Sequence, residues 1–273
     1  MAIMAGPTVV RRQLGRILKR IRVAAGVSVD QVVAHRELGI SRAKLYRMEA
    51  GQHPVKPQDV MVLCQYLGAS QEETRRLVSL ALATQAPNDV GIPVWFQLFR
   101  DLEQVATRIR AYDGELVPGL LQTADYARAV YSATRPGDSE ETIEHQVALR
   151  SERQERFFER DHTARFVVVL DEAVLTRRVG GRDVIREQIE HLHSLNQRGV
   201  VDIKLLPFAA GAHAAMTGAF QIMEFEDPDD PDLVYLEPHV GGRYLQKPEV
   251  TTEYCRLWDL AYGTAIPLKE FSR

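Results

Sequence analysis

Residues 39–51 read GISRAKLYRMEAG, and this stretch decides the fold of the amino-terminal part of the chain. Its first glycine permits a tight reversal of the backbone, and Ser41 is a residue type that favours the N-cap of a helix. Leu45 and Met48 are three residues apart, so they fall on one face of that helix, and a glycine is a typical terminator. The stretch therefore predicts a short helix over residues 41–50 directly after a tight turn.

Apolar residues recur at helical spacing on both sides of this stretch. They predict one helix between residues 11 and 25, a second after Ser28, and two more that begin at Pro57 and Ser70. With the helix over residues 41–50, these form a bundle of five helices. A glycine turn between the second and third helices is the arrangement that lets the third helix enter the major groove of DNA.

Positive charge is concentrated in the same region. Residues 11–56 contain eleven Lys or Arg residues against three acids, a local net charge of +8 in a chain whose total is −3, so the other residues carry −11. A polyanion would therefore meet one basic end of a molecule whose remainder repels it. This distribution favours a nucleic-acid partner over the alternative that the basic residues merely decorate solvated helices.

Residues 26–28 and 39–51 together resemble the XRE family of helix-turn-helix regulators. The resemblance implies a lambda-repressor-like bundle in which the third helix reads base edges. It also implies an ion pair between Glu49 and an arginine of the first helix, for which Arg22 is the candidate by its spacing to Gly26. Such a pair orients helices more than it stabilises them.

DNA contacts are expected from the third helix and from basic residues near it. Their charges suit Arg42, Lys44 and Arg47 to hydrogen bonds with base edges, and Ala43 is small enough for close approach. Tyr46 would stack on sugar-phosphate or simply pack, whereas basic residues of the first helix and Lys56 would hold phosphates. The expected set is Ser41, Arg42, Ala43, Lys44, Tyr46, Arg47 and Lys56. One such helix rarely contacts enough groove, so a homodimer on double-stranded DNA is expected.

A break in helical periodicity predicts the domain boundary. Residues 87–93, PNDVGIP, indicate a linker between a helix-turn-helix domain over residues 1–86 and a second domain over residues 94–273. The second domain is expected to open with a long amphipathic helix that reaches Ile109. After it, short β-branched runs such as residues 166–170 alternate with helical stretches, which predicts an α/β domain with a small mixed sheet covered by helices.

A second resemblance rests on motifs spread through this domain. They are residues 117–123, 126–127, 150, 153–154, 171–175, 180–181, 206–207, 211–213, 218–220 and 234–237. Their order is similar to that in the C-terminal domain of WhiJ-like, antitoxin-like XRE regulators of actinobacteria. The resemblance implies a transcriptional regulator that works with a small partner protein, and it implies no established chemistry for the domain.

A pocket for an effector or partner is expected in this second domain. Arg150 and Arg153 share one side of a helix and suit an acidic group, although interleaved glutamates favour a self-paired, solvated face. His213 lies in a loop of small residues, and the strand carrying Tyr235 ends near it in a mixed sheet. The expected pocket set is Tyr126, Arg150, Arg153, His213, Tyr235 and Glu237.

Signals for catalysis are weak. An enzyme tethered to DNA would have to draw on four scattered residues, Asp171, Glu172, His213 and Glu237. Acids and one histidine occur in any domain of this size, and the chain has no glycine-rich phosphate loop, nucleophile elbow or zinc-finger spacing. Cys64 and Cys255 are far apart and read as free thiols. No catalytic residue, metal or cofactor is therefore expected, and the chain is not expected to be an enzyme.

The function expected from the sequence is sequence-specific regulation of transcription, with a C-terminal domain for sensing and dimerisation. The alternative is an antitoxin-like module that binds a small partner protein and uses DNA binding for autoregulation. No secretory signal precedes the first helix and the longest apolar runs are too short to cross a bilayer, so a cytoplasmic protein without a membrane partner is expected.

Overall fold

The computed structural model of the chain describes residues 8–85, 99–100, 102–159, 165–226, 230–237 and 242–271. The chain divides into two compact units, one of Met1–Leu102 with Glu226–Pro248 and one of Glu103–Phe225 with Glu249–Arg273. The predicted linker, residues 87–93, lies outside the described residues, so the domain boundaries at residues 86 and 94 stay a prediction.

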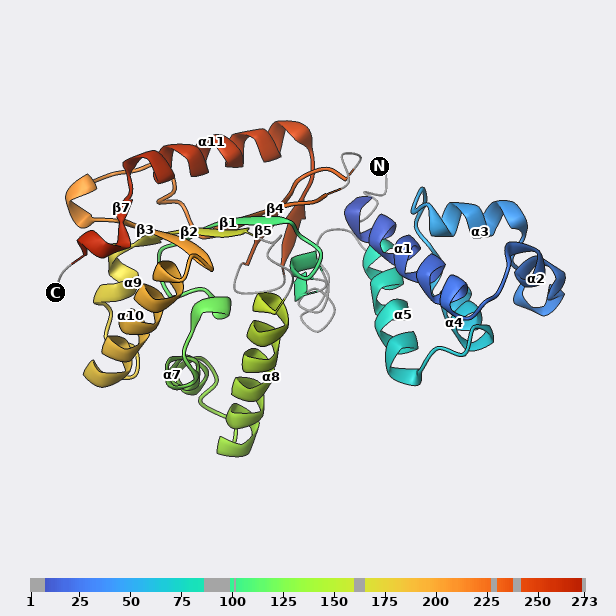
Figure 1. Ribbon diagram of the computed structural model, residues 1–273, viewed down its shortest axis with the longest axis horizontal. Coiled ribbons are helices and arrows are strands. Elements are labelled where there is room, and N and C mark those ends of the chain that lie inside the picture. The colour runs from blue at the N-terminus through green and yellow to red at the C-terminus, as the bar shows by residue number, and fades with distance from the viewer. Residues whose placement is uncertain are drawn as a thin grey trace. The chain divides into compact units, whose positions relative to one another are not determined.

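Residues 8–85 form five α-helices and one 3₁₀ turn (Figure 1). Their bounds are α1 (Thr8–Ala24), α2 (Val29–Ala34), η1 (Arg36–Leu38), α3 (Arg42–Glu49), α4 (Pro57–Tyr66) and α5 (Gln71–Gln85). Apolar side chains from all five helices fill the core, among them the fully buried Leu14, Val32, Leu45, Leu63 and Leu77. The predicted helical bundle is confirmed.

Two glycines bring α1 against the end of α3. A Cβ atom on Gly15 would lie 2.5 Å from the carbonyl oxygen of Glu49 and 2.6 Å from that of Met48. Gly51, which has a φ of +61°, would place a Cβ atom 2.5 Å from the Cα atom of Arg12. Both distances are shorter than van der Waals contact, so the two helices cross at a point where only glycine fits.

Replacing Gly15 by Ala is expected to destabilise the bundle. Helix propensity alone would favour alanine by about 1 kcal/mol, but the new methyl group would press on backbone carbonyls that no change of rotamer can move. We expect the free energy of unfolding to fall by about 1–3 kcal/mol, measured by denaturant unfolding. Gly137→Ala is the matched control, because nothing lies within 4 Å of the added Cβ atom. Unchanged or higher stability of Gly15→Ala would contradict the close contact.

A mixed sheet of seven strands organises the rest of the described chain, in the order β6-β5-β4-β1-β2-β3-β7. The strands are β1 (Arg108–Asp113), β2 (Arg165–Asp171), β3 (Val201–Leu206), β4 (Phe220–Glu224), β5 (Leu233–Leu236), β6 (Arg243–Leu245) and β7 (Ile266–Pro267). Strands β1, β2 and β3 are parallel, whereas β4 pairs antiparallel with β1 and β7 pairs antiparallel with β3. The predicted α/β class with a mixed sheet is confirmed.

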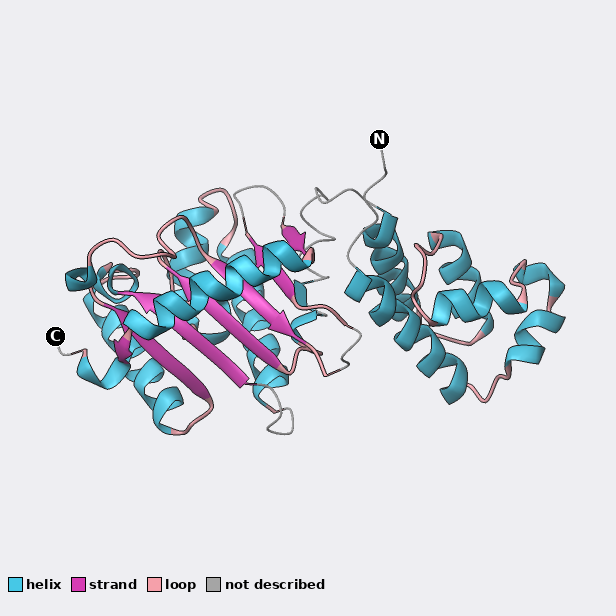
Figure 2. Cartoon of the chain, turned by 90° about the horizontal axis from the view of Figure 1, so that it is seen from above, coloured by secondary structure: helices cyan, strands magenta, loops and turns pink. Residues whose placement is uncertain are grey.

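Helices cover both faces of this sheet (Figures 1 and 2). On one face lie the helices that connect the parallel strands, α7 (Ala124–Thr134), α8 (Glu140–Phe158), α9 (Glu172–Thr176) and α10 (Arg182–Gln197). On the other face lies α11 (Pro248–Thr264). Because both faces are covered, the five central residues of β2 are all buried, as is typical of a parallel strand inside a sheet.

Strand β1 corrects one expectation. Residues 99–100 and 102–103 are helical as predicted, but the extension of that helix to Ile109 is wrong, since the chain forms a strand from Arg108 onward. The four inner residues of β1 are all buried, so their pattern lacks the alternation that marks a strand with one wet face. Its arginine, Arg110, is 9% exposed and pairs at 2.7 Å with Glu224 of β4, so a charge in a central strand is neutralised by the neighbouring strand.

Candidate nucleic-acid interface

Local signals position α3. Gly39 has a φ of +61°, in the left-handed region, and ends η1. Ser41 then adopts an extended conformation as N-cap, and its Oγ accepts a hydrogen bond from the backbone N–H of Lys44 at 3.2 Å. Leu45 and Met48 anchor the helix in the core at 0% and 4% exposure. The turn, the cap and the two anchors together determine which side of α3 faces outward.

The opposite side of α3 carries the residues expected to contact DNA. Five of them are exposed, namely Ser41, Arg42, Ala43, Tyr46 and Arg47, and Lys44 is half-buried. Tyr46 is 53% exposed, which is high for an aromatic side chain. Lys56, the remaining residue of the expected set, is exposed at the N-cap of α4. The helix therefore presents positive, aromatic and small side chains on one outward face.

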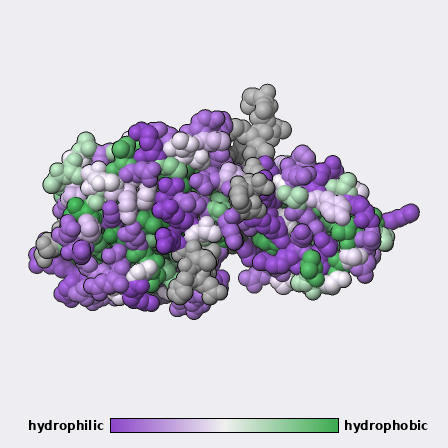
Figure 3. All heavy atoms as spheres, turned by 45° about the horizontal axis from the view of Figure 1, so that its top comes forward, coloured by the Kyte–Doolittle hydropathy of each residue, from purple (hydrophilic) through white to green (hydrophobic). Residues whose placement is uncertain are grey.

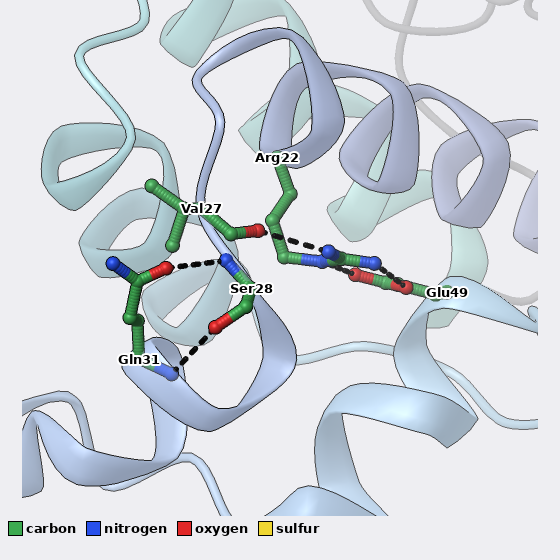
Figure 4. Close-up of polar contacts among 5 residues, drawn as sticks. All are labelled: Arg22, Val27, Ser28, Gln31 and Glu49. Carbon is green, nitrogen blue, oxygen red and sulfur yellow. Dashed lines mark hydrogen bonds and ion pairs between the residues drawn. The ribbon is translucent and has the colours of Figure 1, made fainter.

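A buried ion pair connects α1 to α3 (Figure 4). Arg22 Nε donates to Glu49 Oε1 at 2.6 Å, and Nη2 donates to Oε2 at 2.9 Å. Both residues are below 10% exposure, and the hydrogen bond to Glu49 raises the pKa of Arg22 above its ordinary value. Nη1 of the same guanidinium donates to the carbonyl of Val27 at 3.0 Å. The structure thus brings together the two residues that the family resemblance implied, and Arg22 also holds the segment before α2.

A capping box starts α2 next to this ion pair (Figure 4). The N–H of Gln31 donates to Ser28 Oγ at 3.2 Å, and the N–H of Ser28 donates to Gln31 Oε1 at 2.7 Å. This reciprocal arrangement satisfies two backbone donors at the helix start. The beginning of α2 is therefore held beside α3 by contacts within three residues of sequence.

The cations of α3 differ in how firmly internal acids hold them. Arg42 pairs with Asp30 where both side chains are more than half exposed, and such surface pairs are weak. Lys44 Nζ is held more firmly, at 2.8 Å from Asp59 and 3.3 Å from the carbonyl oxygen of Gly39. Arg47 has no ion-pair partner among the described residues. These two acids lie 12 and 15 residues from their cations, on other helices, so no local pattern in the sequence indicates the pairs.

Two arginines of α1 are engaged by a distant acid of the same compact unit. Asp230 lies 3.1 Å from Arg12 Nη1 and 2.8 Å from Arg16 Nη1. Its side chain is fully buried, whereas the arginines keep 30% and 41% exposure. Lys19 and Arg20, further along α1, are exposed. These four basic residues of α1 therefore form one pair that faces a carboxylate and one pair that faces solvent.

Arg150 and Arg153, expected in a pocket of the second domain, are satisfied by protein groups. Arg150 hydrogen-bonds to Gln122 and, at 2.8 Å, to the hydroxyl of Tyr131, whose ring its guanidinium also covers at 4.5 Å. Arg153 forms two hydrogen bonds of 2.7 and 2.6 Å with the fully buried Glu103. These two arginines fasten α8 to its surroundings.

The other four residues of the expected pocket set occupy different environments. Tyr126 is fully buried. His213 lies 3.5 Å from Asp171, at the end of β2, and its side chain is 6% exposed. Tyr235 is buried on β5, and Glu237 is exposed after it. The pocket was expected from the positions of these residues along the chain. In the structure, most of them are used in packing or in hydrogen bonds within the protein.

The described residues contain neither a membrane-spanning helix nor a metal-binding cluster. None of the helices in these ranges is both long and apolar enough to cross a membrane, and the face in Figure 3 is mainly hydrophilic. Over the same ranges, no group of three or more His, Cys, Asp or Glu side chains is placed to hold a metal ion.

Comparison with known proteins gives two family matches. The family described as "Helix-turn-helix domain" matches residues 13–77, and the family described as "Domain of unknown function (DUF5753)" matches residues 96–270. No curated protein and no solved structure matches the chain. The helix-turn-helix match covers α3 and its supporting helices, and it indicates a DNA-binding regulator.

Replacing Glu49 by Gln is expected to destabilise the bundle. The amide keeps the shape of the side chain but leaves the buried charge of Arg22 without a counter-charge, which costs about 3 kcal/mol or more. Denaturant unfolding measures the loss, and Glu37→Gln, which removes the same charge from an exposed position, should unfold like the parent protein. If Glu49→Gln matched the parent within about 0.5 kcal/mol, the ion pair would have no structural role.

Proposed function

Because the chain belongs to the DUF5753 family and carries a helix-turn-helix domain ahead of that region, we propose that it is a sequence-specific DNA-binding regulator of transcription. In this proposal α3 enters the major groove with its exposed face toward the bases. Ser41, Arg42, Ala43, Tyr46 and Arg47 form the reading face.

The observation that carries the proposal is the division of α3 into two faces. Leu45, Met48 and Glu49 are buried, and they hold the helix by packing and by the ion pair to Arg22. The exposed face is then presented at a fixed angle, which base recognition requires because hydrogen bonds to base edges tolerate little displacement. An α3 that served only the core of the bundle would not need Arg42, Tyr46 and Arg47 turned outward.

The three cations of α3 are proposed to differ in role. Arg47 is the strongest candidate for a base contact, because no acid among the described residues holds it. Arg42 can exchange its weak surface pair with Asp30 for a contact to guanine. Its guanidinium can donate two hydrogen bonds to a guanine, one to O6 and one to N7. Lys44 is held by Asp59 at 2.8 Å with that carboxylate only 16% exposed, so it contributes more to the position of α3 and less to readout.

The α/β domain is proposed to join two copies of the chain and to receive a signal. One recognition helix covers only a half-site, so two copies would contact half-sites about one helical turn apart. The resemblance to WhiJ-like regulators supports a small partner protein or effector as the signal. In the antitoxin-like alternative, the partner protein is the main target, and a stoichiometric small protein co-purified from the native host would favour that role.

Binding to a selected duplex tests the base contacts. The site is first obtained by sequencing DNA fragments retained by the full chain, and affinity is then measured by fluorescence anisotropy at several salt concentrations. Arg47→Ala should weaken binding to the selected site by about tenfold, the value of one good arginine–guanine contact. Affinity of the parent protein should fall steeply with salt, because bound phosphates release counterions.

Arg75→Ala is the matched control, since it removes the same exposed charge from α5. It should bind within about twofold of the parent protein at each salt concentration. The proposal fails if Arg47→Ala and Arg42→Ala both bind like Arg75→Ala, or if affinity for duplex DNA is independent of salt. The number of chains per duplex, measured on the same samples by light scattering, should be two.

Asp230 is proposed to compete with DNA phosphates for Arg12 and Arg16. Its carboxylate occupies the position that a phosphate oxygen would take beside two guanidinium groups. Asp230→Asn should therefore raise DNA affinity and steepen its salt dependence by up to about two counterions. Glu226→Gln, which removes a nearby exposed charge, should leave both quantities unchanged. Equal affinity of Asp230→Asn and the parent protein would exclude the competition.

A further inference from the structure

A cavity of about 480 Å³ opens along α10 in the second compact unit. Its wall combines Arg178 from the connection before α10, one face of α10 itself, and Phe271 near the carboxyl end. The volume lies within the range of small-molecule sites in proteins. The cavity is separate from the six residues that the sequence suggested as a pocket, none of which contributes to its lining.

The lining residues of α10 form a single stripe. Arg182, Arg186, Ile189 and His193 are spaced at four, three and four residues, so they lie above one another on the same side of the helix. Ile185, at 5% exposure, and the half-buried Ile189 supply an apolar floor. The half-buried ring of Phe271 adds a second apolar surface. The cavity thus has an apolar interior bordered by charged groups.

Uncompensated positive charge marks one end of the cavity. Arg178 and Arg182 are exposed, and neither has a carboxylate partner in the part of the chain that the structure describes. Arg186 pairs with Asp183 at 2.9 Å, but both side chains are more than 60% exposed, so this pair is weak. Arg153 of α8, in contrast, pairs at 2.6 Å with the buried Glu103, and none of the arginines at the cavity has a buried carboxylate partner among the described residues.

A glycine places Arg178 beside the first turn of α10. Gly180 has a φ of +69°, and a Cβ atom there would lie 2.8 Å from Val184 Cγ1 and 3.0 Å from the Cβ atom of Ala129. No larger residue fits between α10 and α7 at this point without a shift of one of them. The close approach keeps the Arg178 segment against α10, where Arg178 and Arg182 line the same cavity.

The other end of the cavity is lined by an acid and a histidine. Glu190 and His193 lie two to three turns beyond Arg182 along α10, so a ligand about 10–15 Å long would reach both ends. Glu190 would repel a second negative group and would accept a hydrogen bond from a hydroxyl or amine. The lining therefore selects a molecule with its negative charge at one end, and it disfavours a polyanion such as DNA.

We propose that this cavity binds a small organic anion. Its carboxylate, sulfonate or phosphate group lies between Arg178 and Arg182, whose planar forks suit oxyanions, and its apolar body lies over Ile189 and Phe271. The site adds a specific location and ligand class to the α/β domain, and the binding step does not depend on the proposed role in DNA recognition.

Titration with 8-anilinonaphthalene-1-sulfonate tests the proposal on the full chain. This probe carries a sulfonate on an aromatic body, and N-phenyl-1-naphthylamine is the matched molecule without the charge. The parent protein should bind the sulfonate saturably with one site per chain, measured by fluorescence. Arg178→Ala with Arg182→Ala should weaken that binding by about tenfold or more, since charge-assisted hydrogen bonds are lost. Binding of the neutral molecule should be weak in both proteins.

Arg198→Ala is the control variant, because it removes an exposed arginine from the end of the same helix without touching the cavity. It should bind the sulfonate like the parent protein, and thermal unfolding should show that all variants fold. The proposal is overturned if the double variant binds the sulfonate as tightly as Arg198→Ala does. It is equally overturned if the parent protein binds the neutral molecule as well as the charged one, or shows no saturable binding.

Discussion

The bidentate ion pair between Arg22 and Glu49 is the contact that holds the exposed face of α3 in place. Glu49 is the last residue of α3, and Arg22 stands in the last turn of α1. Two parallel hydrogen bonds allow only one relative orientation of the two groups, and their burial makes any other orientation costly. The glycine contact at Gly15 adds a steric limit at the same crossing. Together they convert a short helix, which would be marginal alone, into a rigid platform.

The arginines and lysines of this chain differ in their carboxylate partners, and a count of charges does not reveal this difference. Arg22 and Arg153 each form an ion pair with a buried carboxylate and hold their helices in place. Arg42 is held loosely on the surface, and Arg47 and Arg178 face solvent without a carboxylate partner among the residues described. An unpaired guanidinium beside a shaped surface remains available to an external anion. The two surfaces proposed here, on α3 and along α10, are both built around such groups.

In the α/β domain, the spacing of apolar residues predicts one strand correctly and misses the start of another. The run at residues 166–170 was predicted as an interior strand, and it forms the buried centre of β2. The stretch that ends at Ile109 was predicted as one long helix, but only residues 99–100 and 102–103 of its described part are helical, and its last two residues begin β1 between β2 and β4. The helical spacing extends into β1 only at Ile109, and a strand covered on both faces has no alternation to mark where it begins. The partner that neutralises Arg110 comes from β4, more than a hundred residues away.

The helical bundle, the helix α3 and the α/β class of the second domain follow from the amino-acid sequence alone, because the signals for these are local. A serine cap, a glycine turn and an apolar repeat each act within a few residues. The packing of the whole fold sets which arginines and lysines pair with internal acids, since Asp230 contacts Arg12 across more than two hundred residues. It also decided that Phe271 and Arg178 border one cavity. Contacts between distant residues depend on how the elements pack, and no short-range pattern specifies them.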